Sequence, residues 1–410
     1  MKRLILVLLL FTISCKESSS RSDAPSRIPE PAPDSEVVMT PVPPPAEPPA
    51  PINPRIKEPS FFVDEKTVEI VRLPAGDGPV QYVLAGRFDG SQKTQLAYVM
   101  ADRIQFRAID GAALATVQHT GFPRLVRLIF GPRTGPDRVL VGWGRNPAGR
   151  SAEDRISFTV TDVSGRTPEK KLTGVHEIIH QTTSQRADPQ DAVVTSDGSI
   201  YLAWFSDKYT VQVARRAASG GEVQKLVTAS MIGRLAVIPA AAGDPQVFVA
   251  RVYGDEPGSS GGLYQLVGTQ LKPLPTVRGV RGLWAGQNKD GLELWVGDGW
   301  DKDYGKVARA FLSMITIQGE KVERRQVAEL TAGYSVMSIA PCDWYGPQKP
   351  GFVIKTNNQL LWIDQAAAAA PVVIAQWGSL ADPVVVDLDG DRKQEILIVS
   401  GEPILLKARK

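Results

Sequence analysis

The sequence predicts an all-β fold, and more closely a seven-bladed β-propeller, from three observations. From residue 61 onward, short apolar runs rich in β-branched and aromatic residues alternate with Gly, Asp, Asn and Pro. The same region shows no apolar periodicity long enough for a helix of three turns. The chain also contains 37 glycines and 32 prolines, which supply the many turns that an all-β protein needs.

A repeated layout of strand, polar turn, strand, loop and strand occurs seven times. The second strands of these units begin about 43 to 61 residues apart. They start at Leu96, Val139, Ile200, Val247, Leu292, Phe352 and Ile396. A period of roughly 40 to 60 residues with three or four strands is typical of propeller blades, which cover each other's faces in a ring. Two packed β-sandwiches are the alternative, and the regular period is against them.

The two ends of the propeller, residues 60–410, are expected to meet in one blade. The last unit runs out after the sequence LLKARK, one strand short of the others. Residues 61–73 (FFVDEKTVEIVRL) supply a spare strand at the other end. A ring whose first and last strands share a blade leaves only short edges. We therefore expect residues 61–73 to complete the last blade and close the ring.

The first 15 residues have the layout of an export signal. A basic start, residues 1–3, precedes an apolar run at 4–11 that is too short for a permanent membrane span. Small or neutral residues then lead to Cys15. The segment resembles a bacterial lipoprotein signal, although Thr12 stands where that family usually has Leu. The resemblance implies that residues 1–14 are removed and Cys15 is lipidated; ordinary export with cleavage nearby is the alternative.

Residues 15–59, which begin with the lipidated Cys, are expected to form a disordered linker. Thirteen prolines lie from Pro25 to Pro59, a composition that favours extended conformations and cannot bury a core. At roughly 3.1 Å per residue, the linker spans on the order of 100 Å. Lys16 replaces the Asp that retains some lipoproteins at the inner membrane. The resemblance therefore favours a propeller held away from the outer membrane.

The sharpest motif is a nine-residue loop, DLDGDRKQE, between two apolar strands at 387–395. Hard cations such as Ca²⁺ take six or more oxygen ligands, and alternate residues of a tight turn present them on one side. Gly390 allows the sharp bend. The candidate ligands for one Ca²⁺ are four carboxylates and one backbone carbonyl, from Asp387, Asp389, Asp391, Glu395 and Lys393.

With the sequence VVVDLDGDRKQEILIVSG, the chain resembles the FG-GAP/VCBS repeat family, including the propeller blades of integrin α chains. The resemblance covers about 20 residues and implies a calcium-binding loop. Arg392 stands in place of the family's second Gly, and Glu395 in place of its last Asp. A solvated acidic turn is the alternative. Residues 86–99 (GRFDGSQKTQLAYV) align with the motif but lack most carboxylates, so we expect the same turn without metal.

Two further motifs suggest sites. A long loop after residue 297 gathers acidic and aromatic residues, and such loops often bind partners. The residues expected to contact a partner are Trp300, Asp301, Asp303 and Tyr304. The alternative is that the two aromatic residues cover a small core within the loop itself. His176 and His180 complete an HExxH pattern, which binds zinc only on a helix. The flanking Gly and β-branched residues favour a strand or loop there.

These features predict a non-enzymatic binding or scaffold lipoprotein of the cell envelope, with a protein or glycan partner. The net charge is +3 and the basic residues are scattered, which excludes nucleic acid as a default partner. Cys342 is expected to be a buried small hydrophobe. One alternative is an outer-membrane assembly factor. The sequence FRAIDGAA at 106–113 faintly resembles the repeats of the propeller lipoprotein found in the machinery that assembles outer-membrane β-barrels. The other is a glycan hydrolase or lyase, which requires charged or Tyr side chains converging on the propeller axis.

Overall fold

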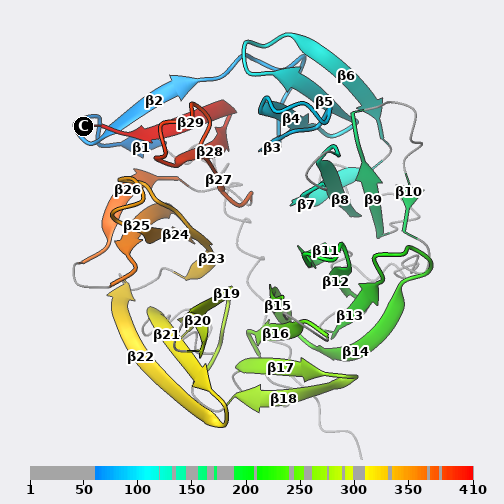
Figure 1. Cartoon of the computed structure of the whole chain (residues 1–410), viewed down its shortest axis with the longest axis vertical. Helices are drawn as coiled ribbons and strands as arrows, with labels where there is room; N and C mark the ends of the chain where they lie inside the picture. The colour runs from blue at the N-terminus through cyan, green and yellow to red at the C-terminus, as the bar shows by residue number, and fades with distance from the viewer. Residues whose placement is uncertain are drawn as a thin grey trace, which may run out of the picture. The chain divides into compact units, whose positions relative to one another are not determined.

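The computed structural model describes 15 ranges, all within the compact unit Ile56–Lys410. They are 61–119, 121–131, 135–144, 156–163, 170–172, 189–206, 210–239, 244–253, 261–274, 277–288, 291–298, 310–330, 335–366, 370–377 and 381–409. In these ranges 29 strands form seven sheets around one axis (Figure 1). The predicted all-β, seven-bladed propeller is confirmed. No helix is present in the described ranges, and thus none there could span a membrane.

Blades 1 to 5 each have four antiparallel strands, which follow chain order from the axis outward. Blade 1 contains β3 (Tyr82–Gly86), β4 (Gln95–Val99), β5 (Arg103–Ala108) and β6 (Ala113–Gln118). Blade 2 contains β7 (Phe122–Ile129), β8 (Arg138–Gly144), β9 (Ser157–Thr161) and β10 (Lys170–Lys171). Blade 3 contains β11 (Pro189–Val194), β12 (Ile200–Phe205), β13 (Thr210–Arg216) and β14 (Gln224–Ser230). Blade 4 contains β15 (Ile232–Ile238), β16 (Gln246–Arg251), β17 (Leu263–Val267) and β18 (Gln270–Leu274). Blade 5 contains β19 (Gly282–Asn288), β20 (Gly291–Asp298), β21 (Ala310–Gln318) and β22 (Lys321–Leu330).

Blades 6 and 7 each use a strand from the start of the propeller. Blade 6 contains β23 (Val336–Pro341), β24 (Gly351–Thr356), β25 (Gln359–Asp364), β26 (Val372–Gln376) and, outermost, β1 (Phe62–Val63). Blade 7 contains β27 (Val384–Val386), β28 (Glu395–Ser400), β29 (Glu402–Ala408) and, outermost, β2 (Val68–Arg72). The strand β2 pairs with β29, from Val68 opposite Ala408 to Arg72 opposite Ile404, and this pairing closes the ring.

The N-terminal segment 61–73 is two strands and not the single strand that its sequence suggested. A turn at Asp64 divides it: the Asp64 carbonyl accepts hydrogen bonds from the N–H groups of Thr67 and Val68 at 3.0 and 2.9 Å. The polar sequence DEKT at 64–67 favours such a turn between two apolar pieces. As a result, β1 extends blade 6 while β2 completes blade 7.

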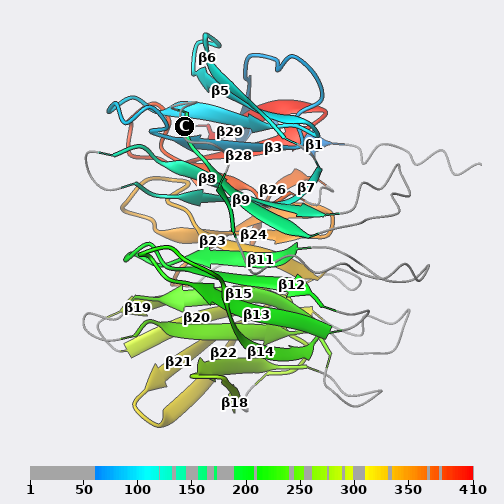
Figure 2. The same ribbon diagram turned by 90° about the vertical axis from the view of Figure 1, so that its right-hand side faces the viewer.

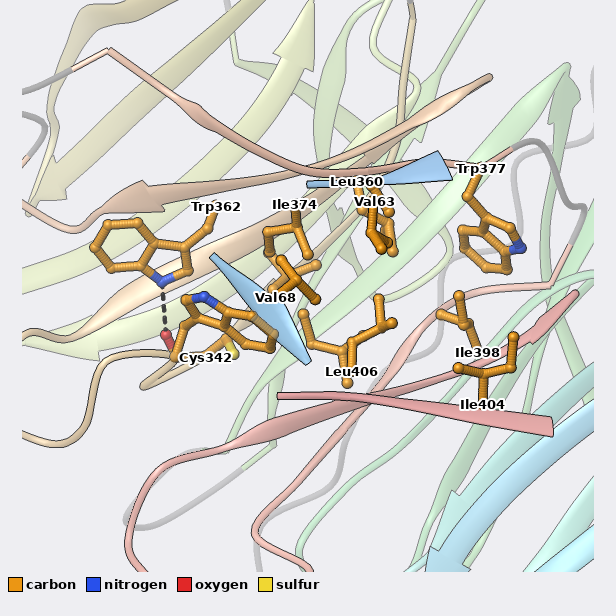
Figure 3. Packing of buried hydrophobic residues seen from close by; sticks show 14 residues of the cluster. Val63, Val68, Cys342, Leu360, Trp362, Ile374, Trp377, Ile398, Ile404 and Leu406 are labelled. Carbon is orange, nitrogen blue, oxygen red and sulfur yellow. Dashed lines mark hydrogen bonds between the residues drawn. The ribbon is translucent and has the colours of Figure 1, made fainter. Parts of the chain in front are cut away.

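The seam between blades 6 and 7 is filled by one apolar cluster (Figure 3). Val63 and Val68, on either side of the turn, both belong to it and are 6% and 2% exposed. Trp362 Nε1 donates a 3.1 Å hydrogen bond to the Cys342 carbonyl inside the cluster. Cys342 is buried, and burial raises the pKa of its thiol to about 12. The segment thus joins two blades through apolar packing as well as strand pairing.

The second strand of each blade explains the apolar repeats in the sequence. Every residue of β12 and of β24 is buried, because sheet neighbours cover both edges and adjacent blades cover both faces. A strand enclosed in this way requires a nearly continuous apolar run. The charged residue Lys355 in β24 is therefore exceptional.

The inner strands define two faces of the ring. Each blade repeats the same antiparallel order around one axis, so the seven inner strands run in the same direction, and all strands cross between the two faces (Figure 2). We call the face where the inner strands begin the start face, and the one where they end the hairpin face. The acidic loop at 387–394 follows β27 on the hairpin face. The connection after Asp298 leaves β20 at the start face, because β20 runs opposite to β19.

Candidate functional site

The four predicted metal-binding carboxylates come together in the acidic loop of blade 7. One oxygen atom from each lies within 4.8 Å of the others: those of Asp387, Asp389, Asp391 and Glu395. Glu395 is only 3% exposed, whereas Asp389 and Asp391 are exposed to solvent. The pairing of Val386 with Glu395 holds the two ends of the loop together. An all-oxygen set of this kind suits a hard divalent cation such as Ca²⁺.

The loop is shaped by hydrogen bonds from its own backbone to these carboxylates. Asp387 Oδ1 accepts from Gly390 N at 2.8 Å, and Asp391 Oδ1 accepts from Lys393 N at 2.8 Å. Gly390 has a φ of 78° and Arg392 a φ of 67°, both in the left-handed region. A Gly at position 392 would adopt this conformation freely, whereas Arg there costs about 1 kcal/mol. The substitution that departs from the family pattern is therefore accommodated with strain.

Lys407, which the sequence did not suggest as part of this site, enters it from β29. Its Nζ lies 2.7 Å from Asp389 Oδ2 and 3.8 Å from Glu395 Oε1. The hydrogen bond from Lys407 lowers the pKa of Asp389, whereas burial raises the pKa of Glu395. A metal ion in the loop must therefore compete with an ammonium group of the protein itself.

The related loop of blade 1 has the same turn but different side chains. Gly90 has a φ of 76°, close to the 78° of Gly390. Asp89 Oδ1 accepts from Ser91 N at 2.7 Å, as Asp389 Oδ1 accepts from Asp391 N at 3.1 Å. With Ser91 in place of the third carboxylate, this loop offers too few anionic ligands for a tight divalent site.

Several predicted residues lie outside the described residues. These are Cys15 with segments 1–14 and 15–59, the pair His176 and His180, and the loop residues Trp300, Asp301, Asp303 and Tyr304. The start of that loop is described at Asp298, which is 4% exposed. Asp298 accepts hydrogen bonds from Ser313 Oγ at 2.8 Å and Arg324 Nη2 at 2.7 Å, and burial raises its pKa. This carboxylate therefore ties β20 to β21 and β22 at the residue before the predicted loop.

A cavity of about 880 Å³ lies on the propeller axis, and the inner strands or adjoining residues of all seven blades line it. Its walls are mainly aliphatic, with the aromatic residues Tyr82 and Trp284 among them. Phe130 lines the cavity just after the end of β7 and is 77% exposed.

Four charged side chains from separate blades meet at the start-face end of this cavity. Arg234 donates to both oxygens of Asp382, at 2.9 and 2.8 Å. Arg127 Nη2 lies 2.6 Å from Asp191 Oδ1 and 3.1 Å from Asp382 Oδ2. Burial alone would raise the pKa of Asp382, but the two guanidinium groups hold it well below its ordinary value. Asp382 is thus kept ionised within a network of ion pairs that crosses the axis.

A fifth charge, Lys355, lies directly behind this network. Its side chain is buried, and Nζ donates a 2.7 Å hydrogen bond to the Ala381 carbonyl. The ammonium also lies 5.3 Å from the centre of the Trp377 ring. Burial lowers the pKa of Lys355 to about 8, with Arg234 and Arg127 acting in the same direction and Asp382 opposing them.

Sequence reasoning missed this axial cluster, although a signal was present. Asp191 and Arg234 each interrupt a largely apolar inner strand. Asp191 and Arg234 are each the third residue of their inner strands, β11 and β15, and pair with Ala203 and Ala250 of the second strands. Lys355 pairs with Ser338 and therefore stands in the second strand of blade 6, at the position that Ala203 and Ala250 occupy in their blades. Charged residues at equivalent positions of buried repeats would have indicated a shared site.

Comparison with known proteins supports the fold and goes no further. No family model and no curated protein matches this chain. Among solved structures, BBS1N in complex with ARL6DN, soaked with lead, has a TM-score of 0.52 at 8% identity, covering 85% of this chain and 97% of that one. The mercury-soaked crystal of the same complex gives a TM-score of 0.49 at 10% identity, with coverages of 85% and 97%. The WD40 domain of SCAP from fission yeast gives 0.41 at 10% identity, with coverages of 84% and 98%. The chain is thus a β-propeller by fold.

Proposed function

We propose that this chain is a non-enzymatic binding or scaffold protein, held at the cell envelope by a lipid on Cys15. The observation that carries the proposal is the closure of the ring by β2. The strand β2 pairs with β29 along five residues, and β1 adds to blade 6 just before it. A tether that reaches the propeller at residue 61 is therefore attached to a closed and firmly paired ring, which suits a domain presented to a partner.

The partner in this proposal is an envelope protein or glycan. BBS1N, which has a similar fold, is found in a complex with ARL6DN, so a propeller of this kind carries a protein partner there. In the present chain, the loop with Trp300 and Tyr304 follows the anchored residue Asp298 at the start face. Aromatic residues on such a loop are suited to protein contacts and to stacking on sugars.

The proposal includes one Ca²⁺ in the acidic loop, where it would stabilise blade 7. The described donor groups fit this ion, because they are carboxylate oxygens and a backbone carbonyl of the same loop, and Ca²⁺ prefers oxygen ligands. The ligands would be Asp387, Asp389, Asp391, Glu395 and the carbonyl of Lys393. Lys407 would have to leave its contact with Asp389, and this sets the affinity of the loop below that of a site without an internal cation.

A glycan-active enzyme is the second candidate, because charged side chains do converge on the axis. Glycoside hydrolysis requires one carboxylic acid that stays protonated long enough to protonate the leaving group. Asp382 is held as an anion by Arg234 and Arg127, and Asp191 accepts hydrogen bonds from Arg127 and Leu235 N. These roles fit structural pairing better than acid catalysis, so the binding role is preferred.

A crosslinking pull-down from intact cells tests the proposed function. The wild-type chain should capture a defined envelope protein or glycan, and a Trp300→Ala, Tyr304→Ala double variant should lose it. A Phe62→Ala variant, altered at an exposed residue of β1, serves as the control and should retain the partner. Recovery of an outer-membrane barrel would favour the assembly-factor alternative. Shortening of a glycan by the purified chain would contradict the non-enzymatic role.

A further inference from the structure

The axial cavity combines a charged end with apolar walls. Its charged lining is Arg127, Asp191, Arg234 and Asp382, at the end nearest the start face. The rest of the wall includes aliphatic side chains from several blades, such as those of Leu128, Val194, Val237 and Val385. A largely apolar cavity of several hundred Å³ with a few convergent polar groups is the usual form of a small-ligand site.

The charges at this end do not balance among the described residues. Arg127, Arg234 and Lys355 contribute three positive charges, whereas Asp191 and Asp382 contribute two negative ones. Lys355 donates to a backbone carbonyl rather than to a carboxylate. An excess positive charge in a poorly solvated region is costly, and one added anion would offset it.

The two guanidinium groups remain accessible from the cavity. The side chain of Arg127 is 24% exposed and that of Arg234 is 16% exposed, although both are paired with carboxylates. Arginine recognises carboxylates through planar, charge-assisted hydrogen bonds. Every nitrogen of the two groups already donates to a protein acceptor, but Arg127 Nη1 and both terminal nitrogens of Arg234 carry a second N–H. An anion in the cavity can therefore accept a further hydrogen bond from each group while the cross-axis ion pairs stay in place.

We propose that the axial cavity binds an organic carboxylate with an apolar body. The carboxylate lies at the end formed by Arg127 and Arg234, with Lys355 behind them, and the body extends along the aliphatic walls toward Phe130. Two kinds of ligand carry a carboxylate on an apolar body: a free organic acid and the C-terminus of a protein chain. This site is separate from the acidic loop and holds whether or not the chain is lipid-anchored.

Calorimetric titration of the purified propeller tests the proposal, with octanoate as the probe. Octanoate should bind, whereas 1-octanol, with the same body and no charge, should bind at least about tenfold more weakly, and octylamine should not bind. N-acetylated Val-Leu with a free or an amidated C-terminus separates the two kinds of ligand. Binding of the free-acid peptide without binding of octanoate or of the amidated peptide would favour a protein C-terminus as the ligand. Equal binding of octanoate and octanol, or no binding of either acid, would overturn the proposal.

A variant of Lys355 tests the charge argument. Lys355→Met keeps the size of the side chain and should weaken octanoate binding about tenfold, whereas Lys321→Met, on the exposed strand β22, should not. In the wild type, binding should weaken as the pH rises through about 8, because Lys355 then loses its proton. The charged groups facing Lys355 are Asp382, Arg234 and Arg127, and none of them changes charge in that range. Wild-type affinity that is constant from pH 7 to 9.5 would contradict the role of Lys355 even if the variant failed to fold.

Discussion

Arg234 in blade 4 forms two hydrogen bonds with Asp382 at the start of blade 7, at 2.9 and 2.8 Å, across the axis of the propeller. The two residues are 148 positions apart in the sequence. Arg234 Nε also donates to the Met337 carbonyl of blade 6 at 2.9 Å. One side chain therefore ties together three blades at the axis of the propeller.

Breaking this pair should destabilise the whole propeller. Asp382→Asn leaves Arg234 and Arg127 without their shared counter-ion, and the loss of a charge-assisted hydrogen-bonded pair that is partly buried costs about 1.5–3 kcal/mol. Urea unfolding followed by tryptophan fluorescence measures the change. The pKa of Asp382 is held below its ordinary value. Its contribution is therefore complete at neutral pH and is lost only as the pH falls below the ordinary range of Asp.

The control for this prediction is Asp102→Asn, which removes a charge paired with Arg103 at an exposed position. It should change the urea midpoint little. Equal effects of the two substitutions would show that the axial pair has no special role in stability.

Calcium should raise the melting temperature of the propeller through the acidic loop. Asp387→Ala combined with Asp389→Ala should abolish the rise seen in millimolar Ca²⁺, because an ion that binds only the folded state stabilises it. The matched substitution Asp89→Ala, in the related loop of blade 1, should leave the rise intact. Burial raises the pKa of Glu395, so this carboxylate takes up a proton more readily than an exposed one. The effect of Ca²⁺ should therefore weaken as the pH becomes acidic. A wild-type protein that shows no shift in Ca²⁺ would disprove the site.

Removal of the internal cation should strengthen calcium binding. Lys407→Met takes away the ammonium that lies 2.7 Å from Asp389 Oδ2. Since Ca²⁺ no longer competes with this charge, the Kd should fall about tenfold, equivalent to roughly 1.4 kcal/mol. Titration with Ca²⁺ in a calorimeter gives the value for both proteins. Weaker binding in the variant would mean that Lys407 supports the loop rather than competing with the ion.

Closure of the ring should depend on the buried face of β2. Val68 is 2% exposed and packs in the seam between blades 6 and 7, so Val68→Asp should cost about 3 kcal/mol or more. Glu69→Asp, at the neighbouring exposed position, should have little effect. Unfolding curves and resistance to limited proteolysis report the difference. If both variants unfolded alike, the seam would not limit the stability of the ring.

The lipid anchor makes a prediction about location. Cys15→Ser should move the protein from the membrane fraction to the soluble fraction, because the thiol is the proposed site of lipidation. Cys342→Ser provides the comparison, since Cys342 is buried within the propeller. Fractionation of cells that express each variant, followed by immunoblotting, tests this directly. A Cys15→Ser protein that stays with the membrane would refute the anchor.

Features that depend on short stretches of chain follow directly from the amino-acid sequence. Enclosed second strands such as β12 and β24 require continuous apolar runs, and their regular recurrence fixed the number of blades. The carboxylates of the acidic loop come from nine neighbouring residues, so their meeting follows from one tight turn. The division of residues 61–73 between two blades was not predicted, because a four-residue turn can direct the chain either way.

Which distant charges meet depends on the assembled ring. Arg127, Asp191, Arg234 and Asp382 belong to four blades and converge because the closed ring brings the inner strands and the residues beside them to one axis. Lys407 reaches the acidic loop only because β29 pairs beside β28. Such contacts depend on the register and closure of the whole ring. The sequence shows the strands and the charged residues within them, but it does not show which of these charges pair.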